Sequence, residues 1–66
     1  MYPNLRAELA RKGMTLTELA KETGMSLNVL SGRVNGKYEF TYSETLKIKK
    51  ALGVDIPLEI LFERAV

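Results

Sequence analysis

Apolar residues recur along the chain at helical spacing in short runs, most of which are closed by a glycine. In the stretch MTLTEL, Thr15 precedes such a run and Glu18 follows three residues later, which is the pattern of a capping box at a helix N-terminus. Thr41 and Glu44 repeat the pattern further along. After Thr15 the apolar positions follow the i, i+3, i+4 rule until Gly24, so this segment is predicted to be an amphipathic helix.

The ends of three further helices are marked by other signals. Pro3 suits the first turn of a helix that Gly13 stops, and Ser26 suits the N-cap of a helix over residues 27–35. A brief last helix is expected to start at Pro57. With the two capped segments, these signals predict five short helices.

Strand signals are nearly absent from the sequence. Only YEFTY, residues 38–42, alternates between polar and apolar positions, and so short a segment cannot make a sheet alone. We therefore predict an all-α fold, a compact five-helix bundle. Because 66 residues leave room for one hydrophobic core, we expect a single domain over residues 1–66.

The two middle helices are separated by only the segment 24–26. A connection this short, with glycine at its start, is typical of a helix-turn-helix, because the chain needs a left-handed conformation to turn sharply. A plain corner between two helices of some other small bundle would have the same spacing. The spacing leaves both interpretations open.

Composition narrows the function classes. The chain has no Cys and no His, which removes disulfides, Cys/His zinc sites, thiol nucleophiles and imidazole bases together. We therefore expect no enzyme, no metal and no cofactor. The net charge is +2 and the pI is about 9.1, with basic residues in excess up to residue 50 and acids in excess beyond it. This balance is a weak signal for an anionic partner.

The start of the sequence carries no signal peptide, tag or transit segment, and no apolar run is long enough to span a bilayer. From this we expect a complete chain that acts in the cytoplasm, away from membranes.

The helix predicted over residues 27–35 has an unusual outward face. At 100° per residue, one side carries three apolar residues that we assign to the core, Leu27, Leu30 and Val34, and the other side carries Asn28, Gly32 and Asn35. Glycine in an exposed helix interior costs about 1 kcal/mol relative to Ala. Small side chains allow a helix to lie close to another surface, and the DNA major groove, about 12 Å wide, admits such a helix. The alternative is that Gly32 is a tolerated weakness and Asn28 simply lies in water.

Several side chains on or near this helix fit DNA chemistry. Asn can pair with adenine and Arg33 with guanine or a phosphate, while Val29 can contact a thymine methyl group. Phosphate contacts need donors near the helix ends. The candidates there are Ser26, Asn35, Lys37 and Tyr38.

The segment LTELAKETGMSLNVLSGRVNGK, residues 16–37, resembles the helix-turn-helix of the phage Cro/repressor-like (xenobiotic-response-element type) DNA-binding family. FTYSETLKIKKAL, residues 40–52, is most similar to its small phage-type branch. The resemblance implies a lambda-repressor-like fold and a transcriptional regulator, expected to be a repressor. It also implies that the protein binds double-stranded DNA at a pseudo-palindromic operator as a homodimer.

The resemblance also implies roles for single positions. Leu16 stands where many members carry a phosphate-binding Gln, so the neighbouring Thr17 becomes a candidate phosphate contact. Leu27 stands at a position that is often Gln or Arg. The DNA-facing positions of the family fall on Ser26, Leu27, Asn28, Ser31, Gly32 and Arg33, and the backbone-contacting ones on Asn35 and Lys37.

The C-terminal stretch LEILFERAV is the candidate dimer surface, through Leu58, Ile60 and Phe62. The alternative is that Leu61 and Phe62 cover the monomer core, which would leave Leu58, Ile60 or Val66 outside. A second function class also stays open: a small module that uses the same helix face to bind a regulatory protein. The two functions differ in salt dependence, because phosphate contacts weaken steeply as salt rises.

Overall fold

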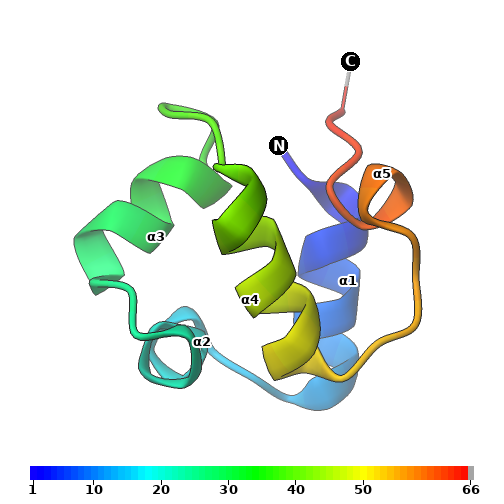
Figure 1. Cartoon of the computed structure of the whole chain (residues 1–66), viewed down its shortest axis with the longest axis horizontal. Coiled ribbons are helices and arrows are strands. Elements are labelled where there is room, and N and C mark those ends of the chain that lie inside the picture. Colours follow the sequence, from blue (N-terminus) through cyan, green and yellow to red (C-terminus); the bar gives the residue numbers. More distant parts are fainter. Residues whose placement is uncertain (66) are drawn as a thin grey trace.

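A computed structural model describes residues 1–65 of the chain, and all regular secondary structure in them is α-helical. No helix within this range has the length and apolar character needed to cross a membrane. Figure 1 shows α4 running through the middle of the view, with α2 and α3 on one side of it and α1 and α5 on the other. The helices are α1 (Pro3–Lys12), α2 (Leu16–Thr23), α3 (Leu27–Val34), α4 (Tyr42–Leu52) and α5 (Leu58–Leu61).

Both predicted capping boxes are present. The Thr15 side chain accepts a hydrogen bond from the backbone N–H of Glu18, whose carboxylate accepts one from the backbone N–H of Thr15. Thr41 and Glu44 make the same reciprocal pair at the start of α4. These bonds satisfy backbone N–H groups that have no partner inside the helix. The starts of α2 and α4 are therefore fixed by residues close in the sequence.

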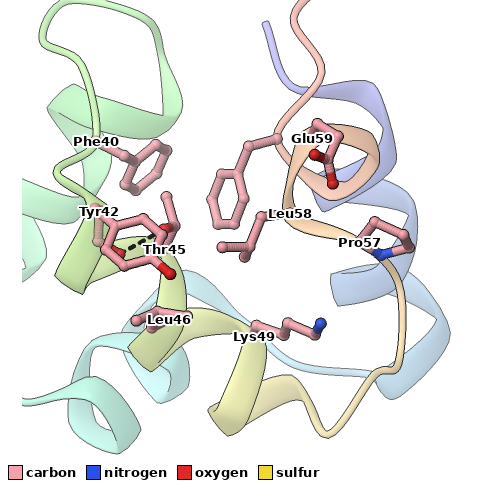
Figure 2. Close-up of a pocket in the computed structure, with 9 residues that line it drawn as sticks. Phe40, Tyr42, Thr45, Leu46, Lys49, Pro57, Leu58 and Glu59 are labelled. Atoms are coloured by element: carbon pink, nitrogen blue, oxygen red, sulfur yellow. Dashed lines mark hydrogen bonds between the residues drawn. The ribbon is translucent and has the colours of Figure 1, made fainter.

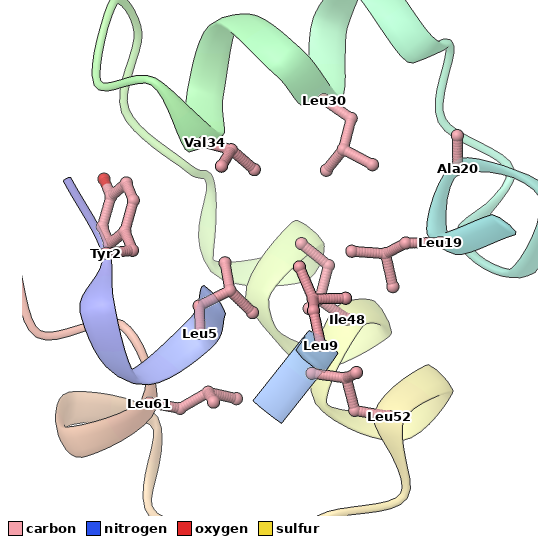
Figure 3. Close-up of a cluster of buried hydrophobic side chains, with 10 residues drawn as sticks. All are labelled: Tyr2, Leu5, Leu9, Leu19, Ala20, Leu30, Val34, Ile48, Leu52 and Leu61. Atoms are coloured by element: carbon pink, nitrogen blue, oxygen red, sulfur yellow. The ribbon is translucent and has the colours of Figure 1, made fainter. Parts of the chain in front are cut away.

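α4 is the central element of the fold and contacts α1, α2 and α5. Its Ile48 is fully buried, and Leu52 is nearly so. Each fully buried side chain of this size contributes about 1.5–3 kcal/mol of hydrophobic stabilisation. The core side chains in Figure 3 are Tyr2, Leu5, Leu9, Leu19, Ala20, Leu30, Val34, Ile48, Leu52 and Leu61.

Three aromatic rings connect distant parts of the chain. Phe40 lies between α3 and α4, and its ring centroid is 5.3 Å from that of Tyr2 and 5.0 Å from that of Phe62, in edge-to-face arrangements. Tyr2 and Phe62 also meet edge to face, at 6.2 Å. Such pairs add about 0.5–1.5 kcal/mol beyond their burial. Phe40 thus turns inward while Tyr38 and Tyr42 stay exposed, and the alternating residues 38–42 form no strand.

The first prediction concerns the α2 cap. Thr15→Ala removes the oxygen that accepts from Glu18 and should lower the free energy of unfolding by about 1 kcal/mol. Thr17→Ala makes the same change at an exposed position of α2 and should stay within about 0.5 kcal/mol of the wild type. Urea unfolding of the three proteins measures both values. Equal losses in the two variants would contradict the capping role.

Candidate nucleic-acid interface

The turn 24–26 sets the entry of the chain into α3. Gly24 has φ 75°, in the left-handed region that L side chains rarely adopt. Beside it, the buried Thr23 hydroxyl donates to the Leu19 carbonyl at 2.8 Å and accepts from the Met25 N–H at 3.4 Å. α2 therefore ends abruptly, and the Ser26 hydroxyl opens α3 by accepting from the Val29 N–H at 3.2 Å.

The packing of α3 rests on two side chains. Leu30 and Val34 are fully buried, whereas Leu27 is 44% exposed and Val29 is 40% exposed. Assigning Leu27 to the core was therefore wrong. Helical spacing alone does not bury it, because it occupies the first position of the helix, where side chains lean back past the N-terminus. Together with the exposed Asn28, it forms part of an accessible first turn.

Gly32 was predicted to be open to the outside, and this too is corrected. A Cβ atom at Gly32 would lie 3.3 Å from Cδ2 of Tyr38 and 3.7 Å from its Cε2, so the Tyr38 ring covers the glycine. Tyr38 itself stays 57% exposed. The outward face of α3 is therefore accessible in its first half and covered by an aromatic ring in its second half.

Two of the phosphate candidates with a hydroxyl group, Thr17 and Ser26, lie near helix N-termini. Thr17 is exposed in the first turn of α2, and Ser26 is exposed immediately before α3. The Ser26 oxygen accepts from Val29, but a hydroxyl keeps a proton to donate. Both groups can therefore donate to a phosphate placed at these helix ends, where the helix dipole also favours an anion.

The C-terminal end of α3 carries a small polar network. The side-chain amide of Asn35 donates to the Ser31 hydroxyl at 3.4 Å, and the Arg6 guanidinium donates to the side-chain Oδ1 of Asn35 at 3.2 Å. Arg6 comes from α1, so no local sequence signal could have placed it here. Lys37 is exposed, with its Nζ atom 5.7 Å from the centre of the Tyr38 ring. The structure thus brings Arg6 and Lys37 to this end of α3.

Arg33 has a partner inside the protein. Its Nε donates to Oε1 of Glu44 at 2.7 Å, and both side chains are mostly shielded from solvent. The same oxygen of Glu44 accepts from the Thr41 backbone in the capping box. The ion pair therefore ties the last turn of α3 to the first turn of α4. Such charge-assisted bonds are stronger than neutral ones.

Comparison with known proteins identifies the family to which this arrangement of α2, turn and α3 belongs. A family model described as helix-turn-helix matches residues 5–58, which include α2, the turn and α3. The chain belongs to the Cro/C1-type helix-turn-helix family. This family consists of DNA-binding transcription regulators, and the chain is a regulator of that class. Neither the search of curated proteins nor the search of solved structures found a match.

In this Cro/C1-type protein, the dimer candidates of α5 lie in different surroundings. Phe62 packs in the aromatic trio, while its remaining surface and Leu58 line a groove between α4 and α5 (Figure 2). Ile60 is 50% exposed and lies outside the groove lining. Val66 lies outside the described residues. The groove is lined by Phe40, Tyr42, Thr45, Leu46, Lys49, Pro57, Leu58, Glu59 and Phe62.

In the part of the chain that the structure describes, no group of three or more His, Cys, Asp or Glu side chains is placed to hold a metal ion.

In this Cro/C1-type protein, the pKa values of the two capping carboxylates, Glu18 and Glu44, are both lowered. Partial burial by itself raises the pKa of Glu44, but hydrogen bonds from the Thr41 backbone and from Arg33 outweigh it and lower the pKa below the usual value. The pKa of Glu18 is lowered mainly by its bond from the Thr15 backbone. A group with a lowered folded pKa stabilises the fold above its unfolded value, about 4.3 for Glu, and loses that effect as pH falls through the folded value.

The second prediction follows for Glu44. Glu44→Gln should lower the melting temperature at pH 7, because the ion pair with Arg33 is lost, and the difference from the wild type should shrink as the pH is lowered to 3, toward the lowered pKa of the Glu44 carboxylate. Glu22→Gln, at an exposed position of α2, is the control and should change the melting temperature little at either pH. Thermal unfolding followed by circular dichroism measures these shifts. A difference for Glu44→Gln that is constant between the two pH values would contradict the ion-pair role.

Proposed function

We propose that this regulator binds double-stranded DNA in a sequence-specific manner, with α3 in the major groove. The observation that carries the proposal is the accessible first turn of α3, where Leu27, Asn28 and Val29 are exposed and no acid occurs between residues 24 and 37. The N-terminal residues of a recognition helix are the ones that reach base edges. A face of apolar and amide groups without negative charge suits that position.

Each side chain of the face then has a role that its chemistry supports. Asn28 would pair with adenine, and Leu27 and Val29 would contact thymine methyl groups. Ser31 is half-buried, and its hydroxyl accepts from the Asn35 amide, so it would serve a base or sugar only at the edge of the interface. We assign Arg33 to the positioning of α3, since Glu44 occupies its guanidinium.

Phosphate contacts would come from both ends of the helix-turn-helix. Hydroxyl donors near the helix N-termini and polar groups beyond the end of α3 would bracket the groove, as positioning contacts do in protein–DNA complexes. We assign these contacts to Thr17, Ser26, Asn35, Lys37 and, as an addition from the structure, Arg6.

We infer that the protein represses transcription by occupying its operator, because a bound dimer excludes other proteins from the same DNA. The stretch 40–52, which is similar to the small phage-type branch, supports an origin in a phage or prophage. Its place of action would then be the cytoplasm of a bacterial or phage-infected cell, at the DNA.

The dimer is proposed to form through the groove between α4 and α5. Tyr42 is 73% exposed and Leu46 is 43% exposed on its wall, which leaves apolar area for a second copy to cover. Lys49 and Glu59 both line the groove, so a two-fold axis would bring Lys49 of each copy toward Glu59 of the other. Two recognition helices would then face half-sites about 34 Å apart.

A protein-interaction module is the second candidate, and one observation favours it. Leu27 and Val29 add exposed apolar area to α3, which protein partners bind readily. Binding of that kind depends little on salt, whereas phosphate contacts release counterions and weaken as salt rises. Salt dependence therefore separates the two functions.

The third prediction tests DNA binding by fluorescence anisotropy of a labelled duplex at several salt concentrations between about 50 and 200 mM. The wild type should bind, and its affinity should fall several-fold or more as salt rises. Lys37→Ala should reduce the slope of log affinity against log salt by about one, the value expected for one lost phosphate contact. Lys12→Ala removes the same charge from the end of α1 and should leave the slope nearly unchanged. Absence of binding at low salt would contradict the proposal that the protein binds DNA.

The fourth prediction tests the dimer by sedimentation with a duplex selected for tight binding. Leu46→Glu places a charge on the groove wall and should reduce the complex from two protein chains per duplex to one. Ile60→Glu adds the same charge at a comparably exposed site outside the groove lining and should keep two chains. The reverse result would place the contact on the Ile60 side of α5.

A further inference from the structure

The Tyr38 ring occupies the place where a base-reading side chain would project from α3. At 100° per residue, position 32 lies opposite the buried Leu30 and Val34, so it points outward from the middle of the helix. Glycine has no side chain to offer there. The ring of Tyr38 lies on it instead, with Cδ2 3.3 Å from the position of a Cβ atom.

The backbone after α3 holds the ring in this place. The N–H groups of Lys37 and Tyr38 both donate to the carbonyl of Gly32, at 2.9 and 3.4 Å, so the chain folds back over the end of the helix. Gly36 makes this reversal possible with φ 81°, a conformation that other residues rarely adopt. The position of the ring is therefore set by the turn as well as by its contact with Gly32.

The ring of Tyr38 is accessible to an external partner. A Tyr that contributed mainly to the core would be buried, yet Tyr38 keeps 57% of its surface in solvent. One side of the ring covers Gly32 and the rest faces outward. Lys37 lies beside the ring, with Nζ 5.7 Å from its centre, and supplies a positive charge for the neighbouring backbone phosphates.

We propose that Tyr38 is a specificity-determining residue that reads a thymine methyl group through its ring. This inference rests on the proposed DNA binding by α3 and adds a reader that comes from outside the helix. The ring lies against the position of a Gly32 Cβ, on the outward side of α3 that is proposed to enter the groove. Its carbon surface suits the C5-methyl group, the apolar feature that thymine presents in the major groove.

The test is a selection of bound duplexes from a randomised pool, run in parallel for the wild type, Tyr38→Ala, Tyr38→Phe and Val29→Ala. The wild type should select a defined half-site with a thymine that Tyr38→Ala no longer requires, while the other positions are retained. Tyr38→Phe keeps the ring and should select the wild-type site. Val29→Ala, the matched loss of an apolar side chain in α3, should relax a different position.

Replacing that thymine by deoxyuridine removes only the methyl group. The wild type should lose about fourfold in affinity, the effect of one buried methyl, and Tyr38→Ala should lose nothing further. A loss for Tyr38→Phe that is equal at all sequences would overturn the inference and assign the hydroxyl to a phosphate. A wild type that binds duplexes without selecting any sequence would overturn it as well and leave only non-specific binding. A wild type that binds no duplex would remove the proposed function itself.

Gly32→Ala provides a second variant that tests the contact from the other side. The new methyl group would lie 3.3 Å from Cδ2 of Tyr38, so the exposed ring must shift by a few tenths of an ångström, while alanine favours the helix. The melting temperature should therefore not fall, and the same thymine preference should be weaker than in the wild type. A Gly32→Ala protein that is folded and keeps the full preference would contradict the proposal.

Discussion

The carboxylate of Glu44 joins the recognition helix to the rest of the protein. α3 is too short to be stable as an isolated helix, so its position depends on tertiary contacts. Leu30 and Val34 bury one side of it, and the 2.7 Å bond from Arg33 to Glu44 fixes its last turn against α4. The pair also neutralises an acid close to the proposed DNA surface, where an unpaired carboxylate would repel phosphates. One interaction thus orients α3 and keeps the charge of its surroundings compatible with DNA.

Helix ends could be predicted from the sequence because their signals are local. The reciprocal bonds of Thr15 with Glu18 and of Thr41 with Glu44 join residues three apart, so the pattern and the structure coincide. The surface of α3 was less predictable. A helical wheel does not show where a helix begins, so it assigned Leu27, in the first turn, to the core. It also shows no residue from outside the helix, so it did not show that the Tyr38 ring covers Gly32.

The remaining features of the site depend on the path of the chain between α3 and α4. That path brings Tyr38 onto α3, Phe40 into the aromatic trio and Glu44 to Arg33. None of these contacts follows from periodicity, since each requires the reversal at Gly36 and the packing of distant segments. Phe40 also lines the groove proposed for the second copy, so the segment that carries Tyr38 is in contact with both surfaces. A second chain bound in the groove would therefore contact the segment between α3 and α4, which also carries Tyr38.

The chemistry of the proposed base readers supports the proposed dimer. Leu27, Asn28, Val29 and Tyr38 are all uncharged, and the arginine of the helix is engaged by Glu44. Three of these four readers would contact methyl groups, each worth about 0.8 kcal/mol, and the single Asn–adenine pair would add about 1–3 kcal/mol. Specific sites exceed non-specific DNA by about 4–10 kcal/mol, so one half-site reaches only the lower part of that range. In the proposed dimer, two half-sites bound by linked recognition helices would add their contributions, so the proposed sequence specificity would depend on the same α4–α5 surface that would hold the two copies together.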